Sequence, residues 1–173
     1  MLLSNGNNIY QVEKINGLTL SELHTSELLT EPMLHNMLNS LLTLQNATTS
    51  ENKDINIYEN YASKIQKRYQ QYNYSEFKGH ESIYNELLQA FEKYESENCG
   101  KKTVIHGDPV FTNILINDSN KIKFIDMRGK VGDELTICGD WLYDWAKVYQ
   151  SLIGYDEILL NKPIYCYLLV FIK

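Results

Sequence analysis

The stretch from residue 103 to residue 126 constrains the fold most, because it alternates short apolar runs with turn-forming polar residues. Residues 103–105, 114–116 and 121–125 are rich in Ile, Val and Phe, and such runs are typical of strands. The segment 118–120, Asp-Ser-Asn, separates the last two runs, and these residue types favour tight turns. The pattern therefore predicts that the last two runs form an antiparallel hairpin.

The register of this predicted hairpin determines which polar side chains meet at its open end. If Asn117 pairs with Ile122, the same register places Asn113 directly opposite Asp126. Asp108 lies in the loop that leads into Asn113. The sequence thus predicts that two carboxylates and one amide converge at one rim of the hairpin.

These three side chains suit phosphoryl transfer. Mg²⁺ prefers oxygen ligands and is often held by one or two protein oxygens together with phosphates and waters, which Asn113 and Asp126 can complement. Asp108 is then free to orient an acceptor hydroxyl and take its proton. Phosphoryl transfer demands mainly positioning and charge stabilisation from the protein. We therefore assign Asp108 as the catalytic base and Asn113 and Asp126 as metal ligands.

Most of the remaining chain is predicted to be helical, which makes the fold α+β and largely α-helical. A helix is expected over residues 18–29, and a stronger one begins at Thr30, an N-cap residue, with Pro32 in its first turn. Another helix is expected over residues 141–152, with Asp140 as its N-cap. The strongest helix shows a single apolar face with helical spacing: Leu34, Met37, Leu38, Leu41 and Leu42.

Two further apolar stripes with helical spacing lie between residues 58 and 94. Such stripes are how helices bury themselves, so they are predicted to be core packing and not a surface on which bases stack. They comprise Tyr58, Tyr61, Ala62, Ile65 and Tyr69 in one stripe, and Ile83, Leu87, Leu88, Phe91 and Tyr94 in the other.

The N-terminal segment is predicted to be a β-hairpin. Asn5-Gly6-Asn7 is a strong tight-turn signal and lies between two strand-like runs within residues 2–15. Gly17 is expected to end the second strand. The segment has no basic region followed by a long apolar run, so it is not expected to be a signal peptide.

Composition excludes several classes of protein. The net charge is -6, and this acidic balance argues against a nucleic-acid partner. The three cysteines, Cys99, Cys138 and Cys166, form no CxxC pair, so we expect neither a zinc site nor a disulfide framework, and a cytoplasmic location. The most apolar run, residues 164–172, is shorter than the roughly 20 residues of a membrane helix and is expected to be a buried helix or strand.

The catalytic segment resembles that of a known family. The run from His106 to Asn113 reads H-G-D-P-V-F-T-N, and it is followed by the hairpin, by Asp126, and by a Y-D-x-A segment that contains Asp144. The sequence resembles the aminoglycoside phosphotransferase and choline kinase family of the protein-kinase-like superfamily over roughly residues 8–155. A finer similarity points to a subgroup found with capsule and surface-polysaccharide synthesis proteins.

The resemblance implies roles for these residues and for the bound molecules. It implies ATP and Mg²⁺ as cofactors, Asp108 as the base, and Asn113 and Asp126 as magnesium ligands. His106 and Asp144 are implied to support the catalytic loop. The acceptor is implied to be a small molecule with a hydroxyl group, such as a sugar, an amino alcohol or an aminoglycoside.

The resemblance also implies a domain division. Residues 1–17 correspond to the last strand of an N-terminal lobe and to the hinge, and residues 18–173 to a kinase-like C-terminal lobe. The hinge backbone at Glu13, Lys14 and Ile15 is expected to meet adenine. Arg128, one of two arginines in the chain, is expected to contact a phosphate or a substrate carboxylate, because its planar fork suits both groups.

The chain departs from the family at its N-terminus. No glycine-rich phosphate loop, strand lysine or partner glutamate fits before residue 15, so the chain is expected to be part of a longer kinase and to turn over slowly or not at all alone. The alternative is a non-catalytic binding module or pseudokinase. A metal-dependent phosphohydrolase is disfavoured because the four histidines are not clustered. Specificity is expected to lie in residues 46–98, and the sequence gives no indication of oligomeric state.

Overall fold

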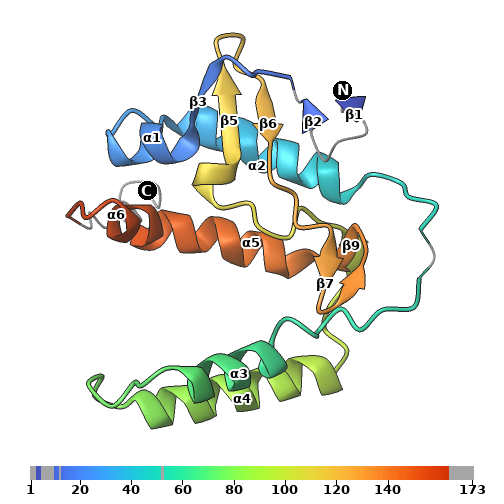
Figure 1. Ribbon diagram of the computed structural model, residues 1–173, viewed down its shortest axis with the longest axis vertical. Helices are drawn as coiled ribbons and strands as arrows, with labels where there is room; N and C mark the ends of the chain where they lie inside the picture. The colour runs from blue at the N-terminus through green and yellow to red at the C-terminus, as the bar shows by residue number, and fades with distance from the viewer. Residues whose placement is uncertain (1–2, 5–9, 12, 52, 164–173) are drawn as a thin grey trace.

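A computed structural model describes residues 3–4, 10–11, 13–51 and 53–163, and it shows an α+β fold with small antiparallel sheets (Figure 1). The strands are β1 (Leu3–Ser4), β2 (Tyr10–Gln11), β3 (Gly17–Thr19), β4 (Lys102–Val104), β5 (Ile114–Asn117), β6 (Ile122–Phe124), β7 (Lys130–Val131), β8 (Glu134–Leu135) and β9 (Cys138–Asp140). The helices are α1 (Leu20–Thr25), α2 (Glu31–Gln45), α3 (Ala62–Gln71), α4 (His80–Ser96), α5 (Trp141–Gln150) and α6 (Asp156–Leu159), with a 3-10 turn at Phe111–Asn113 and a π-helical turn at Ser151–Tyr155.

The predicted hairpin forms, but its predicted register is wrong by one residue. β5 and β6 pair with Ile114 opposite Phe124, and the Ile125 N–H donates to the carbonyl of Asn113 at 3.0 Å. Asn113 therefore faces Ile125, and Asp126 lies one residue beyond. The reason is the length of the turn. Asn117 pairs with Lys121, so the turn has the three residues 118–120 and ends at Asn120 in a left-handed conformation (φ 57°). The predicted pairing of Asn117 with Ile122 would leave residues 118–121 in the turn.

β3 joins this hairpin to make a three-stranded sheet in the order β3-β5-β6. The prediction that Gly17 ends a strand is wrong, since Gly17 pairs with Asn117 inside β3. A side chain there would meet the Ile116 carbonyl oxygen at 2.5 Å, so the close approach of the two strands requires glycine. The predicted domain boundary between residues 17 and 18 falls within this strand.

The N-terminal hairpin and the C-terminal apolar run are described only in part. β1 and β2 pair antiparallel, with Leu3 opposite Gln11, which confirms the predicted hairpin, while its turn at residues 5–7 lies outside the described residues. Cys166 and residues 164–172 also lie outside them. Among the described residues, no helix is both long enough and apolar enough to span a membrane.

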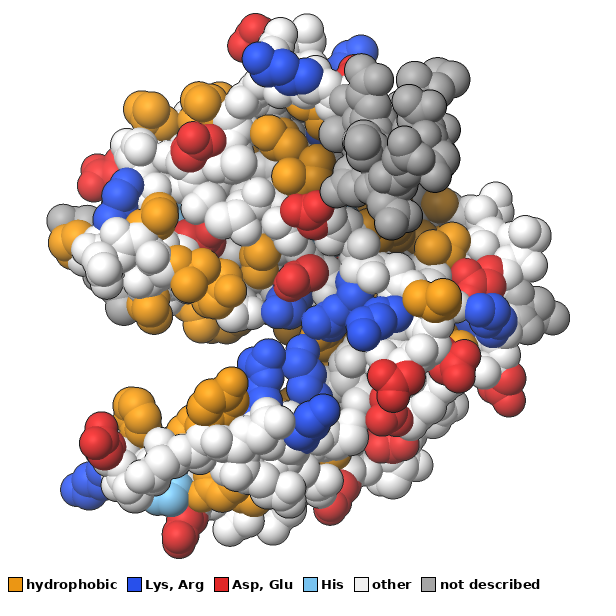
Figure 2. Space-filling view, in the orientation of Figure 1, with side chains coloured by type: hydrophobic (Ala, Val, Ile, Leu, Met, Phe, Trp, Pro, Cys, Tyr) orange, Lys and Arg blue, Asp and Glu red, His pale blue; other side chains and the backbone are white. Residues whose placement is uncertain are grey.

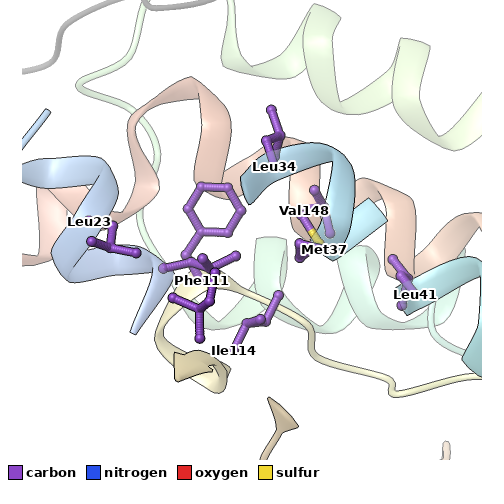
Figure 3. Packing of buried hydrophobic residues seen from close by; sticks show 9 residues of the cluster. Leu23, Leu34, Met37, Leu41, Phe111, Ile114 and Val148 are labelled. Atoms are coloured by element: carbon purple, nitrogen blue, oxygen red, sulfur yellow. The ribbon is translucent and has the colours of Figure 1, made fainter. Parts of the chain in front are cut away.

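The core lies where α1, α2 and α5 meet the β5–β6 hairpin (Figure 3). Phe111, which precedes β5, is fully buried and belongs to one apolar cluster with residues of all three helices. The predicted apolar face of α2 is largely confirmed, because Leu34, Met37 and Leu41 are buried, whereas Leu42 is exposed. This packing fixes the segment that immediately precedes Asn113.

α1 is shorter than the predicted helix over residues 18–29. It begins after Thr19, whose hydroxyl accepts from the Glu22 N–H while the Glu22 carboxylate accepts from the Thr19 N–H, a capping box. The N–H groups of Leu28 and Leu29 then return to the Leu23 carbonyl, which ends the helix. α2 begins at Glu31 as predicted, although the Thr30 side chain makes no capping hydrogen bond.

α3 and α4 form a helical hairpin that projects from the rest of the molecule (Figure 1). The prediction that their apolar stripes are core packing is wrong in part, since neither helix has a buried residue. The stripes pack on each other, with the rings of Tyr69 and Tyr84 stacked at 3.8 Å between centroids, whereas Ile83 and Leu87 are exposed. The reason is that none of the other elements in the described part of the chain covers the tip of the hairpin.

Asp140 fixes this helical hairpin to the core. Its side chain makes no N-cap hydrogen bond to α5, contrary to the prediction. The buried carboxylate instead accepts from the hydroxyls of Tyr61 at 2.6 Å and Tyr94 at 2.9 Å, and from the Lys101 N–H at 3.1 Å. Burial together with this carboxylate raises the pKa of both phenols. One carboxylate therefore holds α3, α4 and the strand that leads to the catalytic loop.

Candidate active site

Asp108 lies in the loop between β4 and the 3-10 turn, at the place where the sequence predicts the catalytic base. Its carboxylate is partly exposed and forms an ion pair with Lys147 of α5, with 3.0 Å between Nζ and Oδ1. A carboxylate that is accessible in this way can accept a proton from a hydroxyl bound beside it. Lys147 was not predicted as a site residue, although it follows Asp144 by three residues on one helical face.

His106 connects the catalytic loop to the segment after β6. Its ring Nε2 lies 2.8 Å from the Ile125 carbonyl oxygen, which can only accept, so Nε2 carries the proton. The ring Nδ1 then accepts from the Asp108 N–H at 3.3 Å. Burial lowers the pKa of this imidazole, against the opposing effects of the Ile125 carbonyl and the charges of Asp108 and Asp126. The His106 ring thus connects the loop at Asp108 to Ile125 through two hydrogen bonds.

Asp144 supports the other side of the same loop. The carboxylate is fully buried, and its two oxygens accept from the backbone N–H groups of His106 and Gly107, each at 2.8 Å. Burial, partly offset by these two donors, raises the pKa of Asp144 to about 6. These contacts fix the backbone that precedes Asp108, and the supporting role implied for Asp144 stays a prediction.

Asn113 and Asp126 lie at the open end of the β5–β6 hairpin, one before β5 and the other after β6. The Asn113 Nδ2 donates to the Asp108 carbonyl at 2.9 Å. The amide oxygen of Asn113 has no hydrogen-bond partner within the described part of the chain. Asp126 directly follows Ile125, whose N–H binds the Asn113 carbonyl. Asp126 is exposed and has a left-handed backbone (φ 56°), a conformation rare outside glycine and enriched at functional sites.

The catalytic loop and the segment 125–128 are joined at three points. Besides the two contacts of His106 and Asn113 with Ile125, the Arg128 N–H donates to the His106 carbonyl at 2.9 Å. No group of three or more His, Cys, Asp and Glu side chains that could hold a metal ion occurs within the described residues. An amide oxygen and one carboxylate remain, and such a small set of hard oxygen donors fits Mg²⁺, which keeps waters and phosphates as its other ligands.

Arg128 lies beside the catalytic loop, as its predicted contact with a substrate or phosphate requires. Its Nη1 donates to the Tyr143 hydroxyl at 2.8 Å, and Lys64 Nζ of α3 donates to the same oxygen at 2.8 Å. Sequence reasoning missed Lys64 and Tyr143 as parts of one cluster, because no spacing along the chain connects α3 with α5. Only the docking of the helical hairpin through Asp140 brings them together.

The predicted adenine-binding segment leads from β2 to β3. Glu13 and Lys14 are exposed, and Ile15 is partly buried. No hydrogen bond or ion pair of their side chains is formed with any other described residue. The proposed contact of their backbone with adenine therefore stays a prediction.

Comparisons with protein-family models, with curated proteins and with solved structures find no match for this chain. Its function has to be argued from the geometry of the site.

Proposed function

We propose that this chain is an ATP-dependent phosphotransferase, related to the aminoglycoside phosphotransferase and choline kinase family, that acts on a hydroxyl of a small molecule. One observation carries the proposal. Hydrogen bonds join the loop of Asp108 and Asn113 to the segment that begins at Ile125 and continues into Asp126. A base and two oxygen ligands next to one another in this order are the parts that phosphoryl transfer requires.

In this proposal Asp108 is the catalytic base. The acceptor hydroxyl binds near its carboxylate, the proton passes to Asp108, and the hydroxyl oxygen bonds to the γ-phosphorus as the bond to the leaving ADP oxygen breaks. Lys147, 3.0 Å from Asp108, adds positive charge near the transferred group. Asp144 and His106 position the loop without touching the substrate.

Asn113 and Asp126 would hold Mg²⁺. The amide oxygen of Asn113 and the exposed carboxylate of Asp126 are hard donors of the kind that this ion selects. When bound, the ion would neutralise the charge of the ATP phosphates. Adenine would meet the backbone of residues 13–15.

The test is turnover of Mg·ATP in the presence of mixed sugars and amino alcohols, measured as ADP formed and as phosphate transferred. Replacing Asp108 by Asn is expected to lower turnover by about 100-fold or more, because a positioned base contributes that much. Asp118→Asn, an exposed carboxylate in the hairpin turn, is the matched control. Equal turnover in Asp108→Asn and wild type rejects the base, and nucleotide binding without any turnover favours a non-catalytic binding module.

A further inference from the structure

Two cations beside the catalytic loop share one neutral oxygen. Lys64 Nζ and Arg128 Nη1 each lie 2.8 Å from the Tyr143 hydroxyl, and both cationic groups lie near the face of its ring, at 5.4 and 5.7 Å from the centroid. Neither cation has a carboxylate within ion-pair distance among the residues that the structure describes. In a chain whose net charge is -6, this is a local excess of positive charge without a counter-ion.

The two cations lower the pKa of the Tyr143 phenol that lies between them. Tyr143 is buried, and burial alone raises the pKa of a phenol. The ammonium of Lys64 and the guanidinium of Arg128 outweigh this and hold the pKa of Tyr143 below its usual value of 10.0. A bound anion would supply the negative charge that the cluster lacks.

The cluster is directly adjacent to the proposed base. A side-chain carbon at Gly107 would lie 2.7 Å from Arg128 Cβ, so Arg128 lies against the residue before Asp108. Lys147, four residues after Tyr143 on α5, reaches Asp108 itself. Figure 2 shows Lys and Arg side chains gathered around the hollow between the helical hairpin and the main body, with acidic side chains at its upper edge.

We propose that the acceptor molecule carries an oxyanion, a carboxylate or a phosphate ester, which Lys64 and Arg128 bind beside Tyr143 while its hydroxyl reaches Asp108. The guanidinium fork of Arg128 suits two oxygens of such a group, and the ammonium of Lys64 on α3 adds a point charge. The Tyr143 hydroxyl spaces the two cations. This inference rests on the proposed phosphotransfer, and it makes α3 part of the acceptor site.

The experiment measures oxyanion binding without nucleotide, so that its result is independent of turnover. Inorganic phosphate, glycerol 3-phosphate and D-glycerate are titrated into the full chain and followed by amide chemical shifts, with glycerol as the neutral probe. Phosphate-bearing probes and glycerate together show which oxyanion is preferred. The variants are Lys64→Gln and Arg128→Gln, and the control is Lys67→Gln, an exposed lysine on the same helix.

The expected result is binding of at least one oxyanion probe but not of glycerol, weakened about tenfold or more by either variant, since a charge-assisted bond contributes that much. Lys67→Gln should leave the affinity unchanged. Equal affinity in wild type and both variants overturns the proposal. Oxyanion binding that needs Lys64 and Arg128, together with equal, measurable turnover in Asp108→Asn and wild type, would retain this site and reject the proposed base.

Lys64→Gln keeps the test decisive if Arg128→Gln fails to fold. Lys64 lies on a helix without buried residues, so its replacement should not affect folding even if Arg128→Gln does. Its thermal unfolding curve, compared with that of Lys67→Gln, verifies this before the titration.

Discussion

Replacing Asp144 by Ala is predicted to destabilise the fold by an amount that increases as the pH falls. The buried carboxylate accepts from the N–H groups of His106 and Gly107, both at 2.8 Å, and both residues are buried. Alanine leaves two buried donors without an acceptor, each of which costs about 1–3 kcal/mol. The loss of these two hydrogen bonds sets the largest decrease in the free energy of unfolding that the substitution can cause.

The charge of Asp144 opposes this loss at neutral pH. Burial raises its pKa from 3.8 to about 6 despite the two N–H donors. The folded state therefore holds this proton more tightly than the unfolded chain does. The resulting stability is complete below pH 3.8 and is lost as the pH rises through about 6. The full shift corresponds to about 3 kcal/mol, of which about 2 kcal/mol falls between pH 7 and pH 4.5.

The assay is urea unfolding at pH 7 and at pH 4.5, followed by fluorescence of Trp141 and Trp145. At pH 7 the two effects largely offset, so Asp144→Ala should lower the free energy of unfolding by no more than about 3 kcal/mol. At pH 4.5 the difference from wild type should be about 2 kcal/mol larger. Asp133→Ala, an exposed carboxylate, is the control. A destabilisation by Asp144→Ala that is equal at both pH values, or larger at pH 7, refutes the reasoning.

Two further predictions concern residues that hold the site together. Asp140→Ala should raise amide hydrogen exchange across residues 62–96 while β5 and β6 stay protected, because it removes the acceptor of Tyr61 and Tyr94; uniform exchange in the variant and wild type would contradict this anchor. The imidazole of His106 should titrate below 6.5 and carry its proton on Nε2 in a nitrogen NMR spectrum; a proton on Nδ1 at neutral pH would contradict the assigned hydrogen bonds.

Much of the fold follows from local sequence patterns. The catalytic hairpin, α2 and α5 were predictable, because strand-like runs, turn residues and helical spacing act over a few residues. The register was not, since it depends on the left-handed conformation of Asn120, which lengthens the turn to three residues. The exposure of Ile83 and Leu87 was also missed, because an apolar stripe does not reveal whether another layer covers it.

The residues of the candidate site that lie close together along the chain were likewise predictable from the sequence. The positions of Asp108, Asn113 and Asp144 relative to the loop follow from motif spacing, and the structure shows the hydrogen bonds that connect them. Lys147 could have been found from its three-residue spacing after Asp144. Lys64 could not, because it reaches Tyr143 only through tertiary docking of α3.

In the proposed site Asn113 and Asp126 hold one metal ion together with nucleotide. This arrangement is tested by the binding of Mn²⁺ in the presence of ATP, measured by electron paramagnetic resonance. Asn113→Ala and Asp126→Asn should each weaken Mn²⁺ binding by about tenfold or more, since even residues outside the ligand shell cost that much. The double variant should lose little beyond either single one, because both act on the same ion. Asp118→Asn should bind like wild type. Wild-type affinity in both single variants, or independent and additive losses, would contradict a shared metal site.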